Sequence, residues 1–225
     1  MITRRSQTGP TGRYVRARRS CAGTSLVEVV VATSLLAIVM FAVFQGVAST
    51  QAALESTDSR LRNLDEARVL MAATSKDLRT AVRLQSGTSP FVVADGLTTT
   101  FYANLDTISA PKQVRIYIDA SSQLVEEVRD ADVGSVAPNY TFAGAPHVRF
   151  VGRYVANTAA MPIFTYLDAT GNTLAATPLN AADLLAVRAV RLNLVVKRST
   201  TAVVAATTLV NRVRLPNLDY NAVAG

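Results

Sequence analysis

The chain has 225 residues, 49% of them hydrophobic, and its 23 basic and 16 acidic side chains give a formal net charge of +7. One cysteine excludes an intramolecular disulfide. With one histidine and no G-x-S-x-G, P-loop or H-E-x-x-H motif, the sequence contains no recognisable catalytic or metal site, and no cofactor is expected.

The first 23 residues form a basic segment without any acidic residue. Its charged residues are Arg4, Arg5, Arg13, Arg16, Arg18 and Arg19. A positive flank before an apolar helix keeps the N-terminus in the cytoplasm, so the rest of the chain is expected to be exported. The residues after Gly23 carry 17 basic and 16 acidic side chains, a net charge of +1. The excess of basic residues in the full chain therefore mainly indicates how the chain is oriented in the membrane.

An apolar stretch follows, interrupted by one charged residue, Glu28. Residues 24–44 number 21, and a helix of that length rises roughly 31 Å, close to the thickness of a bilayer core. We expect a membrane-spanning helix over residues 24–46. A carboxylate inside such a helix is costly and indicates a functional site with a partner. The alternative is that Glu28 reaches back to the lipid headgroups.

The small residues Ala22 and Gly23 lie before the apolar stretch, whereas a secretory signal has its cleavage site after it. Cleavage between Gly23 and Thr24 would remove the basic segment, together with Cys21, and leave the apolar helix at the new N-terminus. The new ammonium of Thr24 would then pair with Glu28 of a neighbouring helix. Because desolvation offsets much of that attraction, the pair would mainly fix the register between helices.

Gly23, Glu28 and the apolar residues 29–44 resemble the N-terminus of type IV pilins and of the pseudopilins of type II secretion. The resemblance implies that a prepilin peptidase cuts after Gly23 and methylates Thr24, where phenylalanine is usual in the family. It also implies a single-pass protein of the cytoplasmic (inner) membrane with an extracytoplasmic C-terminal domain. An assembly platform in that membrane would bring the chain into a pilus or pseudopilus, where its helix packs against other subunits.

Residues 47–86 are expected to continue the helix in an amphipathic form. The apolar side chains that recur at helical spacing are Leu54, Leu61, Leu64, Met71, Leu78 and Val82. Gly46 is the expected bend or local break, and Gly87 the expected stop. We expect this apolar face to pack on the chain's own domain. A coiled-coil homodimer through the same face is the alternative.

From Phe91 onward, apolar and polar residues alternate in short runs rich in β-branched residues, which predicts strands. The predicted strands are 98–103, 114–118, 123–129, 147–155, 163–168, 190–196 and 209–215. Asp168 to Asn172 reads as a hairpin turn, and Asn180 as the cap of a short helix.

The predicted fold class is α+β, with one antiparallel sheet packed on the second half of the long helix. The predicted segments are a leader at 1–23, a membrane helix at 24–46, its amphipathic continuation at 47–86 and a single β-rich domain at 87–225. This half of the chain loosely resembles the J-class minor pseudopilins and the W-type minor pilins. That resemblance implies a place in a tip or initiation complex.

Three groups of residues in the C-terminal half are candidate sites. The acidic residues Glu126, Glu127, Asp130 and Asp132 suggest either a Ca²⁺ site or, as we prefer, a solvated hairpin end. Asp168, Thr170 and Asn172 are explained by a turn. His147, at a strand start, is expected to be a surface residue.

The last strands are basic, whereas residues 24–183 have a net charge of −4. The basic residues are Arg188, Arg191, Lys197, Arg198, Arg212 and Arg214, against Asp219 alone. They are expected on outward strand faces. They could instead contact an acidic neighbouring subunit, or DNA through its phosphates.

The sequence thus favours a structural, non-enzymatic pilin or pseudopilin subunit. Two other classes remain open: a signal-anchored extracytoplasmic binding domain that enters no filament, and a secreted protein whose first 48 or so residues are an atypical signal.

Overall fold

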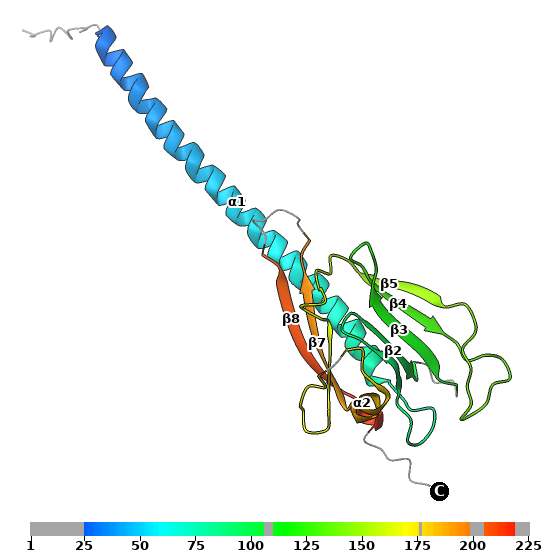
Figure 1. Ribbon diagram of the computed structural model, residues 1–225. Helices are drawn as coiled ribbons and strands as arrows, with labels where there is room; N and C mark the ends of the chain where they lie inside the picture. Colours follow the sequence, from blue (N-terminus) through cyan, green and yellow to red (C-terminus); the bar gives the residue numbers. More distant parts are fainter. Residues whose placement is uncertain (1–24, 106–109, 176, 199–204, 219–225) are drawn as a thin grey trace, which may run out of the picture. The chain divides into compact units, whose positions relative to one another are not determined.

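The computed structural model describes residues 25–105, 110–175, 177–198 and 205–218. The chain forms two compact units, residues 1–51 and 52–225. Helix α1 (Leu26–Arg79) contributes residues to both (Figure 1). Ser25 caps its start, since its carbonyl and hydroxyl oxygens accept hydrogen bonds from the Glu28 N–H at 3.0 and 3.2 Å.

The helix continues through Gly46, so the predicted break there is wrong. The Gly46 carbonyl accepts hydrogen bonds from the hydroxyls of Ser49 and Thr50, each at 2.9 Å. These local bonds satisfy the hydroxyls inside the helix, and hydrogen-bonding of this kind is compatible with an uninterrupted helical backbone.

The helix ends at Arg79, short of the predicted end at Ser86. Ala81 already forms an antiparallel bridge with Ala103, and the Val82 N–H donates to the Tyr102 carbonyl at 2.8 Å. Pairing with a distant strand therefore replaces the last helical bonds. Gly87 has a φ of +80° in the loop that follows, where it does not end the helix.

The first sheet is an antiparallel meander in the order β1-β2-β3-β4-β5. Its strands are β1 (Phe91–Ala94), β2 (Thr98–Ala103), β3 (Lys112–Ile118), β4 (Leu124–Arg129) and β5 (His147–Gly152). The second sheet has the antiparallel order β6-β7-β8. Its strands are β6 (Phe164–Leu167), β7 (Ala189–Val196) and β8 (Thr207–Arg214).

Two short helices accompany the second sheet, α2 (Ala181–Ala186) before β7 and the 3-10 helix η1 (Pro216–Leu218) after β8. Asn180 caps α2 by accepting a hydrogen bond from the Asp183 N–H at 2.9 Å. The predicted cap is therefore confirmed, and so is the hairpin turn at Asp168, which is closed by the Leu167–Thr173 bridge.

The strands divide into two sheets, and the prediction of a single sheet is wrong. After β5 the chain crosses to the second sheet, where Val155 bridges Val196. The Asn157 side chain fixes this crossing. Its amide donates to the carbonyl of Asn193 at 2.7 Å, and its oxygen accepts from the Val195 N–H at 2.8 Å. These bonds direct the following strand to the second sheet and not to the free edge of β5.

The second half of α1 packs against both sheets, as the expectation of self-packing required (Figure 1). Its buried residues are Asn63, Ala67, Leu70, Met71, Thr74, Ser75, Asp77 and Leu78. The predicted face is only partly right, because Leu54 and Leu61 are 65% and 57% exposed. Burial of α1 starts at Asn63, so the apolar face continues beyond the part that the sheets cover.

Candidate functional site

The first candidate site is the start of α1. Its apolar side chains are exposed in the structure, and this part of the helix is long and apolar enough to cross a membrane. Gly23 and Thr24, the predicted processing and methylation positions, lie outside the described residues, as does Cys21. Glu28 lies in the first turn of the helix.

The hydroxyl groups of this segment find partners within the helix. Thr33 donates to the Val29 carbonyl at 3.0 Å, and Ser34 donates to the Val30 carbonyl at 2.7 Å. Within the described part of the chain, no side-chain hydrogen bond or ion pair engages the Glu28 carboxylate. Glu28 is therefore the polar group of the apolar segment that needs a partner from outside.

The four acidic residues considered as a Ca²⁺ site each have a different partner. Glu127 accepts from the Tyr117 hydroxyl at 2.9 Å, and Asp130 lies 2.8 Å from the Lys112 ammonium. This lysine holds the pKa of Asp130 below its usual range. Asp132 accepts from the N–H of Ala143 at 2.9 Å. Within the described ranges no three acidic, histidine or cysteine side chains form a metal-binding group.

The polar residues at the Asp168 turn are explained by the turn itself. The Asp168 carboxylate accepts hydrogen bonds from the Thr170 hydroxyl at 2.7 Å and from the Asn172 N–H at 2.9 Å. The Thr170 hydroxyl bond is the main reason why the pKa of Asp168 is lowered. His147 starts β5, as expected, with a largely exposed side chain 3.5 Å from Asp130.

An ionic cluster that the sequence did not reveal joins α1 to the first sheet through two buried carboxylates and a half-exposed arginine. Arg149 on β5 makes an ion pair with Glu126 on β4 and lies 3.6 Å from the carboxylate of Asp77 on α1. The side chains of Asp77 and Glu126 are 8% and 6% exposed. One oxygen of Asp77 is buried without a hydrogen bond. One arginine thus faces two buried carboxylates.

Burial, with the nearby Glu126 carboxylate as the next cause, raises the pKa of Asp77 to about 7. Arg149 and Lys76 oppose this rise without cancelling it. Because the folded state holds the proton more tightly, Asp77 contributes stability below its ordinary pKa of 3.8 that is lost as the pH rises through about 7. The cluster can therefore weaken the helix–sheet contact at alkaline pH.

Replacing Asp77 by asparagine, which resembles the protonated carboxyl, should raise the free energy of unfolding at pH 8 by on the order of 1 kcal/mol. At pH 4 the variant and the wild type should unfold at nearly the same urea concentration. Urea titration of the full chain in detergent, followed by circular dichroism, measures the free energy of unfolding of the variant and of the wild type at each pH. Asp65→Asn, on an exposed face of α1, is the matched control, and an equal gain there would contradict the assignment.

The basic residues of the last strands do not form one uniform surface. Arg188 donates to the carbonyls of Leu185 and Val187 at 2.7 and 2.8 Å, and the Arg198 guanidinium stacks over Tyr154 at 5.1 Å. Arg191 and Arg212 are directly opposite each other on β7 and β8, and both are exposed. The outward orientation is therefore confirmed for these two, and they place like charges side by side. Asp219 lies outside the described residues.

Comparison with known protein families, curated proteins and solved structures finds no match.

Proposed function

We propose that this protein is a structural subunit of a type IV pilus or of a type II secretion pseudopilus, of the minor class. The observation that carries the proposal is Glu28, alone among apolar residues at the start of a membrane-length helix, five residues after Gly23. A solitary carboxylate has no use in a simple membrane anchor, and it is costly there. It is useful in a helix that packs against identical or similar helices and needs a fixed register.

The C-terminal unit supports the same proposal. Its helix is buried on one face from Asn63 to Leu78, where two antiparallel sheets pack against it. The apolar side chains of α1 before Asn63 are exposed, and none of the residues that the structure describes covers them. In the proposal the membrane covers them first and the helices of other subunits cover them after assembly. The prepilin peptidase and the inner-membrane assembly platform are the partners at these two stages.

Co-purification tests the proposal. The full chain, tagged at its C-terminus and extracted from membranes in mild detergent, should bring down other short proteins that begin with a basic leader, a glycine and a glutamate five residues later. Mass spectrometry identifies them. Recovery of the chain alone, or only with proteins that lack this N-terminal pattern, would instead favour a signal-anchored domain that enters no filament.

A further inference from the structure

Strand β8 is an edge strand whose outer side has no strand partner within the described ranges of the chain. The Leu215 N–H donates to the Arg188 carbonyl at 3.1 Å. Together with the register of the β7–β8 pair, this bond shows which residues of β8 direct their backbone groups toward β7 and which direct them away from it. Odd-numbered residues of β8 therefore form their backbone bonds with β7. The N–H and C=O groups of Thr208, Val210 and Arg212 point to the open edge.

A groove runs between this edge and α1. Its first hollow, of about 540 Å³, is lined by Met71 and Ala72 of α1 and by Leu209 and Asn211 of β8. A second hollow of about 500 Å³ is lined by Leu61 and Leu64 of α1 and by Thr207 at the start of β8. Leu209 is only half-buried, whereas Leu192 and Leu194 of the central strand β7 are 1% and 2% exposed. The inner face of the sheet is thus only partly covered at Leu209, whereas Val213 further along β8 is fully buried.

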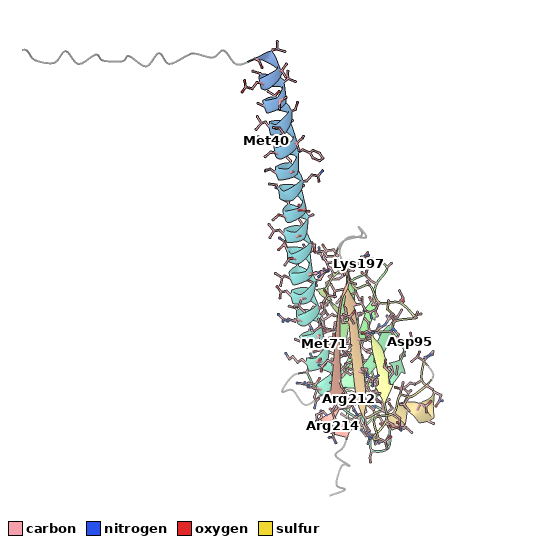
Figure 2. The ribbon with its side chains drawn as sticks, turned by 90° about the vertical axis from the view of Figure 1, so that its left-hand side faces the viewer. Met40, Met71, Asp95, Lys197, Arg212 and Arg214 are labelled. Carbon is pink, nitrogen blue, oxygen red and sulfur yellow. The ribbon has the colours of Figure 1, made fainter. Side chains whose placement is uncertain are left out.

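Basic side chains outnumber acidic ones around this edge, although Asp168 lines a hollow together with Arg212 and Arg214, and Arg68 lies 3.6 Å from Asp65. Arg68, Lys76 and Arg79 line the first hollow from α1, and neither hollow is lined by an aspartate or a glutamate. On the outer face of the sheet, Arg212 and Arg214 are exposed at the end of β8, as Figure 2 shows. Arg191 lies opposite Arg212 on β7, so like charges are adjacent on that face.

We propose that the edge of β8 binds an extended acidic segment of another protein, which adds a fourth strand to the sheet. Its backbone bonds to the open N–H and C=O groups, as in other complexes formed by strand addition. Alternate side chains of an added strand point to opposite faces. Acidic side chains opposite Val210 and Arg212 therefore meet the arginines on the outer face, and the apolar side chains between them enter the groove.

Two other occupants fit less well. A second copy of β8 would add two further arginines to this edge and contribute no acidic side chain. DNA would contact the outer arginines, but it has no strand backbone to satisfy the edge and no apolar side chain for the groove beside Met71 and Leu209. This inference concerns the edge of one sheet and does not depend on the proposed function.

The probe is a labelled eight-residue peptide of alternating glutamate and valine, mixed with the full chain in detergent. Hydrogen exchange should slow at least tenfold at the amides of Thr208, Val210 and Arg212, with little change at Leu209 and Asn211. A peptide with the same residues in two blocks should bind at least tenfold more weakly by fluorescence anisotropy. An alternating lysine–valine peptide should not bind.

Two variants separate the contributions of the backbone and of the charge. Val210→Pro removes one N–H at the open edge without removing a bond to β7, a position where an edge strand tolerates proline. It should weaken peptide binding about tenfold, whereas Val210→Ala should not. Arg212→Glu should weaken binding by at least tenfold and should not change the melting temperature by more than a few degrees.

If the peptide slowed hydrogen exchange equally at the odd and even amides of β8, the proposal would be overturned. Peptide binding that neither variant changes would also overturn it. Protection of the even amides without peptide, increasing with protein concentration, would assign the edge to a second copy. Protection of the same amides by a DNA duplex but not by the peptide would assign it to nucleic acid. Both of these outcomes contradict the acidic strand.

Discussion

Replacing Glu28 by alanine should leave the chain processed and inserted in the membrane but should remove it from filaments. The carboxylate is not needed for a helix to enter the bilayer, since the substitution makes the segment more apolar. It is needed if one axial offset between neighbouring helices is to be preferred over the others. Immunoblots of membrane and filament fractions measure the ratio of the protein in filaments to the protein in membranes. We expect this ratio to fall at least tenfold.

Two control variants make this result specific to the charge of Glu28. Glu28→Gln keeps the shape of the side chain and removes its charge, so it should fail in the same way. Ser34→Ala changes another polar residue of the same helix, whose hydroxyl bonds only to the Val30 carbonyl at 2.7 Å, and should assemble normally. Normal incorporation of Glu28→Ala would refute the role of this residue in register.

Replacing Gly152 by alanine should destabilise the C-terminal unit by about 1–3 kcal/mol, the range found when extra atoms are forced into packed sites. A Cβ at this position would lie 2.5 Å from Cδ2 of Leu70 and 2.7 Å from Oε1 of Glu66. Leu70 is fully buried, and Glu66 already accepts a hydrogen bond from the Arg153 N–H at 2.8 Å. Neither can move without disturbing the helix–sheet contact.

Gly144→Ala is the matched control, because the nearest atom to its Cβ would be an Asp132 oxygen at 4.0 Å. Its urea midpoint should stay close to that of the wild type, while the midpoint of Gly152→Ala should fall. If both variants unfold at the wild-type urea concentration, α1 and β5 do not pack as closely as the structure has them.

The strands of the C-terminal unit were the most predictable part of the fold. Residues 98–103 were predicted as a strand and form β2 with the same bounds. This strand pairs with β3 over its whole length, so local alternation and tertiary pairing agree. The end of α1 was harder to predict. No glycine or proline occurs near Arg79, and the helix ends there because Ala81 pairs with Ala103, a contact that local sequence does not contain.

The ionic cluster escaped prediction for a similar reason. In the sequence, Glu126 is one of several acidic residues near a hairpin, and Asp77 is one charge among others near the end of α1. Only the pairing of β4 with β5 brings Arg149 opposite Glu126, and only the packing of α1 brings Asp77 to both. The local sequence gives no signal of this cluster, because the burial of Asp77 beside Thr74 and Leu78 is seen only in the structure.

The N-terminal mass of the chain, recovered from membranes of cells that contain a prepilin peptidase, tests directly whether the leader is removed after Gly23. We expect the protein to begin at Thr24, without the six arginines of the leader, and Thr24 to carry a methyl group on its amine. A chain that begins at Met1 would contradict this expectation and indicate an uncleaved anchor. A chain that begins near Ser49 would contradict it in favour of a secreted protein.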